Sequence, residues 1–305
     1  MRAAVTVALL LILAVAIDWD SVADRLAHGS WELFALGVLV VVIALAIGAL
    51  RWHVFLRAGG AEPSLLQTFR AYGMGMFANN FLPTGFGGDA VRVVAIAPTA
   101  PTASRAIASV LVDRVTALGC LILLAWLTLV VAPSDVPESL VAVLAIATAS
   151  GVATAIVCVL VARSGTRAGA RRVTRWVARV LAQLGMVGGS GSVLAVTTAL
   201  GLLYQAAVVF ATWVIARSID LELSFTLLAV VTPLVIIVTL MPISIAGFGV
   251  REGGYVALLA QAGISATDAT VLSLLNVAAL AIATLPGAVA MLAPAATPRE
   301  RVPAP

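Results

Sequence analysis

The sequence contains no lysine, since all 18 of its basic residues are arginine. Without lysine the chain has no Schiff-base amine and no phosphate-binding loop of the Gly-Lys-Ser/Thr type. Charged residues of either sign are scarce as well, at 10% of the 305 residues, whereas soluble domains carry about a quarter. With 62% hydrophobic residues, the chain has too little polar surface to cover a fold in water, so lipid is its predicted solvent.

Cysteine and histidine are rare, with two of each. Cys120 and Cys158 lie in apolar runs without CxxC spacing, which indicates packing roles rather than a disulfide or a metal site. His28 and His53 flank predicted spans and are interpreted as interfacial residues rather than metal ligands. We therefore expect no metal, no cofactor and no nucleic-acid partner.

Long apolar runs predict an all-α integral membrane protein. About 20 apolar residues make one helical span, and the alternating ten-residue segments of outer-membrane barrels are missing. We favour an uncleaved first span before Asp18, although Ala14-Val15-Ala16 loosely resembles a signal cleavage site for removal of 1–16. The five further predicted spans are about 31–50, 106–131, 140–162, 193–216 and 269–292.

Arginine placement predicts the topology, because arginine excess marks the cytoplasmic side. The loop after the first span is acidic, whereas Arg51 and Arg57 follow the second span. Six arginines follow the span that ends at 162, and two follow the last span. Both termini are therefore predicted in the cytoplasm, in an inner (plasma) membrane protein. One membrane domain is expected over 1–293, with a cytoplasmic tail at 294–305.

The basic segment 168–187 has apolar residues at helical spacing, with arginines on the opposite side. Such a helix lies in the headgroup plane and contacts anionic inner-leaflet lipids. A plain positive-inside anchor is the alternative interpretation. The segment is predicted to be a cytoplasmic amphipathic helix in either case.

Two segments do not fit as simple spans. By the arginine rule 58–104 begins and ends in the cytoplasm, whereas 223–267 begins and ends outside. Each is interrupted by Pro and Gly, and non-helical backbone at membrane depth must be buried in protein or line a cavity. We predict two re-entrant broken-helix pairs, with ordinary pairs of spans as the alternative. The fold is then six full spans plus two re-entrant pairs.

The two interruptions resemble each other. The first reads LPTGFGGDAVR at 82–92, and the second reads MPISIAGFGVREGG at 241–254. Because topology assigns them to opposite faces, they predict an inverted repeat with halves at about 31–132 and 193–292. Transporters with such repeats bind substrate at the interface of the halves, near broken helices. A duplication retained only for packing is the alternative.

The polar residues at the interruptions form a candidate phosphate site. Helix N-termini attract anions, and Arg92 and Arg251 add charges whose fork geometry suits a phosphodiester. Asp89 and Glu252 could hold these arginines while the site is empty, or contact a cationic headgroup.

A second polar feature lies inside the span 106–131. Asp113 and Arg114 lie about 12 Å into the hydrocarbon core, where each charge costs roughly 2.5–3.5 kcal/mol. Adjacent residues on a helix do not face each other, so each needs another partner. Arg92 is the expected partner of Asp113, and Asp89 or Glu252 that of Arg114. A purely structural network is the alternative. The candidate substrate-binding residues are Asn79, Asn80, Asp89, Arg92, Asp113, Arg114, Arg251 and Glu252.

Three motifs in this order carry a family resemblance over about 30–290. They are Asn79, Asn80, Pro83, Gly85, Gly88, Asp89 and Arg92; then Asp113-Arg114; then Pro242, Gly247, Gly249, Arg251, Glu252 and Gly253. The chain resembles the flippase-like membrane domain of lysylphosphatidylglycerol synthases, the multiple peptide resistance factor family. The resemblance implies movement of a lipid between leaflets, either aminoacylated phosphatidylglycerol or a lipid-bound saccharide. Asp113 stands where the family more often has Glu, and we expect no synthase activity because no aminoacyl-transferase domain follows the last span.

The predicted function is therefore that of a lipid flippase-like transporter, not an enzyme. Its expected partner is a membrane phospholipid or lipid-linked substrate, and the sequence has no nucleotide-binding motif. One rival is an integral-membrane transferase, which needs a general base or metal ligands, and only Asp89, Asp113 and Glu252 are candidates. The other rival is a non-transporting partner subunit of a lipid-modifying enzyme.

Overall fold

The computed structural model describes residues 19–82, 87–164, 191–240 and 247–292, and within this part every regular element is a helix. Five of its helices are long and apolar enough to cross a membrane, which confirms an all-α, multi-pass membrane protein. The predicted first span, the amphipathic helix 168–187 and the tail 294–305 lie outside the described residues. The five long helices are α3 (Trp31–Ala58), α6 (Ala103–Val131), α7 (Glu138–Ser164), α9 (Gly191–Arg217) and α12 (Ala266–Leu292).

Helix α3 extends beyond its predicted end at Leu50 and continues to Ala58. The reason is apolar burial, since Trp52 and Phe55 are 0% and 1% exposed. The interpretation of Arg51 as a cytoplasmic marker was wrong, because its side chain is buried within the bundle. Arg57 is exposed, as that interpretation requires.

Shorter helices occupy the two segments predicted to be interrupted. Helices of 10 residues span about 15 Å and cannot cross a hydrocarbon core of about 30 Å alone. The residues between the helices of each pair, 83–86 and 241–246, are not described. The short helices are α4 (Leu65–Phe81) with α5 (Gly87–Ile96), and α10 (Phe225–Leu240) with α11 (Val250–Leu259).

The turns before the short pairs share one geometry. Helix α3 is followed by Gly60 with φ 77°, and α9 is followed by Asp220 with φ 55°. In each turn the next backbone amide donates to a carbonyl oxygen in the last helical turn, as in a Schellman motif. Ser64 and Ser224 follow these turns, and the side chain of each accepts a hydrogen bond from a backbone amide in the first turn of the next helix.

The long helices after the short pairs also begin alike. Thr102 and Ser265 accept hydrogen bonds from backbone amides in the first turns of α6 and α12. A short 3₁₀ helix precedes each cap, η1 (Ala97–Thr99) and η3 (Ala260–Ala262). The order and the helix ends of α3 to α6 are thus repeated in α9 to α12.

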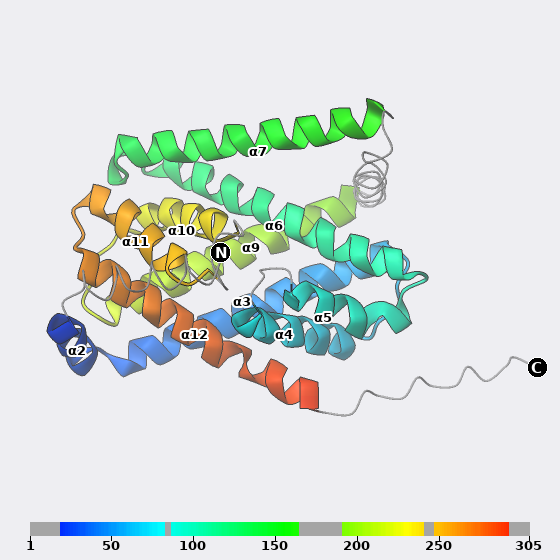
Figure 1. Cartoon of the computed structure of the whole chain (residues 1–305), viewed down its shortest axis with the longest axis horizontal. Coiled ribbons are helices and arrows are strands. Elements are labelled where there is room, and N and C mark those ends of the chain that lie inside the picture. The colour runs from blue at the N-terminus through cyan, green and yellow to red at the C-terminus, as the bar shows by residue number, and fades with distance from the viewer. Residues whose placement is uncertain (1–18, 83–86, 165–190, 241–246, 293–305) are drawn as a thin grey trace, which may run out of the picture.

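Helices α3 and α9 pack against each other in antiparallel directions. Gly37 near the start of α3 lies against Ile215 near the end of α9, and Gly48 lies near Tyr204. Helix α4 packs on α12, and α10 packs on α6 (Figure 1). The α4–α12 contact is tight at one point, because a Cβ at Gly287 would lie 2.2 Å from the carbonyl oxygen of Gly73.

Helix α7 lies at the edge of the bundle in Figure 1. Its outer residues are apolar and exposed, including Val152, Ile156 and Val157. Exposed apolar side chains on a membrane-length helix are typical of a lipid-facing surface. Among the described residues, one cluster of buried apolar side chains is formed mainly by α9, α10 and α12, and a second mainly by α3, α4 and α6.

Candidate functional site

The centre of the buried polar region is Asp113, in α6. Nε and Nη2 of Arg51 lie 3.0 and 2.8 Å from Oδ1 of Asp113, and Nη2 of Arg92 lies 2.9 Å from its Oδ2. Both carboxylate oxygens therefore accept hydrogen bonds from guanidinium groups. The expected pairing of Asp113 with Arg92 is confirmed. Arg51 is a further partner that the sequence analysis missed, and the apolar helical pattern that continues past Leu50 is the signal that could have revealed it.

Asp89, near the start of α5, holds a second part of the same cluster. Its Oδ2 accepts from Nε of Arg114, and its Oδ1 lies 3.6 Å from Nη1 of Arg92. Of the two carboxylates expected for Arg114, the structure thus uses Asp89. These five residues, Arg51, Asp89, Arg92, Asp113 and Arg114, are called the ion network below. Three arginines and two aspartates give it a formal charge of +1.

Aromatic faces fix the arginines of the ion network in place. The guanidinium carbon of Arg92 lies 4.2 Å from the ring centre of Trp52 and 4.6 Å from that of Tyr72. Arg51 lies 5.5 Å from the ring centre of Tyr204. Such contacts stabilise a guanidinium that has lost its water. Because buried charges are costly unless they are paired, the network ties α3, α5 and α6 together.

Asn79 links the two helices that flank the first interruption. Its Oδ1 accepts a hydrogen bond of 2.8 Å from the backbone N–H of Gly88, in the first turn of α5. A Cβ at Gly88 would lie 2.0 Å from the carbonyl oxygen of Gly75, so α4 and α5 approach here at a distance that only glycine permits. Asn80 contacts α12 instead of α5, since its Nδ2 donates to Oγ1 of Thr284 at 2.8 Å.

Glu252 caps the helix that follows the second interruption. Its Oε2 accepts a hydrogen bond of 2.6 Å from the backbone N–H of Gly249, where φ is 80° at the start of α11. The Glu252 side chain is buried, and a carboxylate at a helix N-terminus is stabilised by the helix dipole. Glu252 therefore positions the first turn of α11, which carries Arg251.

A cavity of about 140 Å³ joins the two interruptions. Asn79 and Asn80 reach it from the end of α4, and Arg251 reaches it from the start of α11. Apolar side chains of α12 complete the wall. The eight predicted residues therefore fall into neighbouring groups: three line the cavity, four belong to the ion network, and Glu252 positions Arg251. Their roles in substrate binding remain predictions. The lining residues are Asn79, Asn80, Phe81, Phe248, Arg251, Val277, Leu280 and Ala281.

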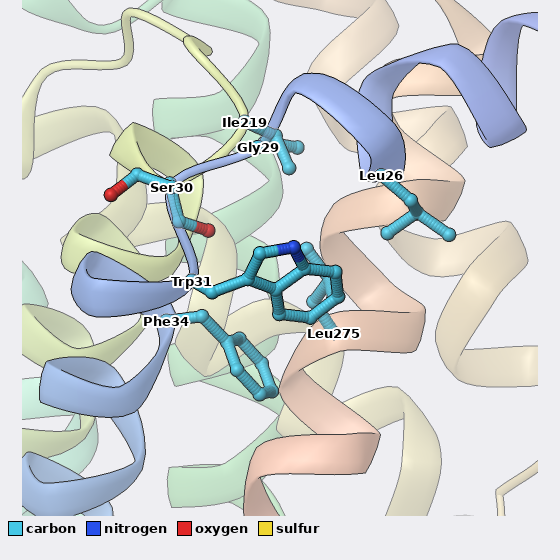
Figure 2. Close-up of a pocket in the computed structure, with 8 residues that line it drawn as sticks. Leu26, Gly29, Ser30, Trp31, Phe34, Ile219 and Leu275 are labelled. Carbon is cyan, nitrogen blue, oxygen red and sulfur yellow. The ribbon is translucent and has the colours of Figure 1, made fainter.

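A second hollow lies where the turn before α3 meets the turn after α9. Figure 2 shows Trp31 and Phe34 beside Leu275, with their rings edge to face and with Leu26 of α2 (Trp19–His28) across from them. Its volume is about 10 Å³, which suffices for about one water molecule. This hollow is a packing defect and is no candidate for a substrate site.

The candidate residues offer ion pairing and hydrogen bonding. Within the described ranges, no group of three or more His, Cys, Asp or Glu side chains is placed to hold a metal ion. Arg251 and the amides of Asn79 and Asn80 provide the polar part of the cavity wall. Guanidinium and amide groups are the donors that proteins use to bind phosphate.

Comparison with known proteins gives two matches. A family described as "Lysylphosphatidylglycerol synthase TM region" matches residues 1–287. The UPF0104 membrane protein PH1989 of Pyrococcus horikoshii is 32% identical over 83 residues, which are 26% of this chain and 25% of that protein. The similarity thus spans about a quarter of this relative's length.

Proposed function

We infer the function from one premise: the chain belongs to the family of the lysylphosphatidylglycerol synthase TM region. We propose that it is a flippase-like transporter, which moves a phosphate-bearing lipid between the leaflets of the inner membrane. The observation that carries this proposal is the cavity at which residues of both helix interruptions meet. We further propose that both termini lie in the cytoplasm, in keeping with the arginine distribution.

The packing of the helices supports an inverted repeat. Helices α3 to α6 and α9 to α12 have the same order, similar lengths and matching caps. The contact of α4 with α12 is matched by that of α10 with α6, which is the result of exchanging the two halves. The equivalent helices α3 and α9 run antiparallel, as inversion requires. The cavity lies between α4 of one half and α11 and α12 of the other, where inverted-repeat transporters bind their substrates.

The proposed site binds the phosphate through Arg251. A guanidinium presents two parallel N–H groups to a phosphodiester, and the amide of Asn79 adds a neutral donor. Arg92 and Arg114 remain predicted further contacts, because a phosphate can compete with Asp89 for them. Asp89, Asp113 and Glu252 are the predicted residues for orientation or proton coupling. The acyl chains stay in lipid between the spans, and the lipid or an ion gradient drives movement.

The test is lipid movement in proteoliposomes. Phospholipids labelled on an acyl chain, which leaves the headgroup unchanged, are reconstituted with the wild type or with Arg251→Gln. Because Arg251→Gln loses one charge-assisted hydrogen-bonding group, we expect its rate of lipid movement to be at least about tenfold lower than that of the wild type. Arg70→Gln is the matched control, because Arg70 is exposed on α4.

The outcomes of this test distinguish the proposed function from the proposed binding site. Wild-type movement above the protein-free background, with loss in Arg251→Gln alone, supports both the function and the site. Equal movement in both variants contradicts the site and leaves the function standing. Background rates for every phospholipid tested contradict the transporter, and favour a partner subunit or a transferase.

A further inference from the structure

The cavity wall has a positive and otherwise neutral composition. Of the eight described residues that line it, Arg251 alone is ionisable, two are amides and five are apolar. Oδ1 of Asn79 is used by Gly88, so its Nδ2 is the part that can donate to a ligand. Nδ2 of Asn80 donates to Thr284, so its Oδ1 can accept from a hydroxyl group. The wall thus presents cationic and neutral donors together with one neutral acceptor.

The neighbouring carboxylates lie outside the described lining of the cavity and take part in other contacts, although Oδ1 of Asp89 and Oε1 of Glu252 accept no hydrogen bond from the described residues. Asp113 accepts from two arginines and Asp89 from Arg114, and Glu252 accepts from the backbone N–H of Gly249. No carboxylate is among the eight described residues that line the cavity, so an ammonium group bound there has no anionic partner on this wall. The ion network itself carries a formal charge of +1, which repels an added cation.

The volume of the cavity limits the size of the bound group. A cavity of about 150 Å³ in another protein holds one benzene molecule. The present cavity of about 140 Å³ therefore matches one phosphate with a small substituent. A sugar attached through a diphosphate is several times larger and brings a second phosphate, for which the described residues of the wall offer no second guanidinium.

We propose that the cavity selects an anionic headgroup with one phosphate and a small, neutral, hydroxyl-bearing substituent. It discriminates against headgroups that carry an added ammonium group and against diphosphate-linked sugars. Arg251 and Asn79 bind the phosphate, while Asn80 accepts from the hydroxyl group. This inference rests on the proposed function, since it names the substrate class of the same site.

Binding to the purified protein in detergent tests this selectivity without any transport. Thermal unfolding is followed with dihexanoyl phosphatidylglycerol, with its lysyl ester and with inorganic phosphate, since a ligand stabilises the folded state according to its dissociation constant. We expect phosphatidylglycerol to bind at least about tenfold more tightly than either other probe. Arg251→Gln removes this preference. Asn80→Asp, which places a carboxylate in the wall, shifts it toward the lysyl ester.

Movement of the same two lipids in proteoliposomes separates this inference from the proposed function. Equal or tighter binding of the lysyl ester overturns the selectivity, even if both lipids move between leaflets. Inorganic phosphate that binds as tightly as the lipid shows that the site takes a free anion, which also overturns it. Selective binding without lipid movement supports the selectivity and contradicts the transporter.

Discussion

Replacement of Asp113 by Asn is the sharpest test of the ion network. The change removes the carboxylate that accepts from both Arg51 and Arg92, whose side chains are 2% and 4% exposed. Breaking a buried ion pair by removing one partner costs about 3–5 kcal/mol, because the other charge stays buried without compensation. Arg51 loses its carboxylate partner, and Arg92 keeps only Asp89, whose Oδ1 lies 3.6 Å from its Nη1, so we expect a loss of unfolding free energy of about 3–5 kcal/mol.

The measurement is denaturant unfolding of the purified protein in detergent. Glu222→Gln is the control, because Glu222 pairs with Arg217 at 3.5 Å but its side chain is 85% exposed. Exposed pairs contribute at most about 1 kcal/mol. The double replacement of Asp113 by Asn and Arg51 by Gln removes one of the uncompensated charges, so it is expected to be less destabilising than the sum of the two single changes. A loss under about 1 kcal/mol in Asp113→Asn, or strict additivity in the double variant, refutes the reasoning.

Two further predictions concern the interruptions and the helix caps. Gly88→Ala places a Cβ 2.0 Å from the carbonyl oxygen of Gly75 and is expected to destabilise the protein by about 1–3 kcal/mol or more. Its control is Gly253→Ala, which is expected to be neutral or slightly stabilising because no described atom lies within 4 Å of the added Cβ. Thermal unfolding of both variants checks this prediction, and equal melting temperatures contradict it. Ser64→Ala removes the cap of α4 and is expected to cost about 1 kcal/mol in the same assay, with unchanged stability as the contrary result.

The spans were predictable because a run of about 20 apolar residues is the length that one membrane-spanning helix requires. All five predicted spans within the described residues correspond to helices, and the two broken segments correspond to pairs of short helices. The clusters of Pro and Gly at 83–88 and 242–249 marked these interruptions, whereas the single prolines Pro233 and Pro286 lie inside α10 and α12. The cost of charges in lipid also predicted the pairing of Asp113 with Arg92, and that of Arg114 with Asp89 or Glu252, of which Asp89 is the observed partner.

The failures have a common cause. Arg51 was interpreted as an interfacial residue because it follows an apolar run, yet α3 continues and places it opposite Asp113. Glu252 accepts a hydrogen bond from the backbone of Gly249, a contact that the sequence did not predict. In both cases the outcome depends on how helices far apart in the sequence pack, which local spacing does not encode. The cavity between α4, α11 and α12 is likewise a product of tertiary packing.

The contact between Arg51 and Asp113 also has a consequence for biogenesis. The two residues are 62 positions apart, so α3 leaves the ribosome well before the carboxylate that neutralises its arginine. Until then a lone buried charge opposes release of α3 into lipid by roughly 2.5–3.5 kcal/mol. We therefore expect helix α3 to remain beside the insertion machinery until α6 emerges, so that the first half of the protein enters the bilayer as one unit rather than helix by helix.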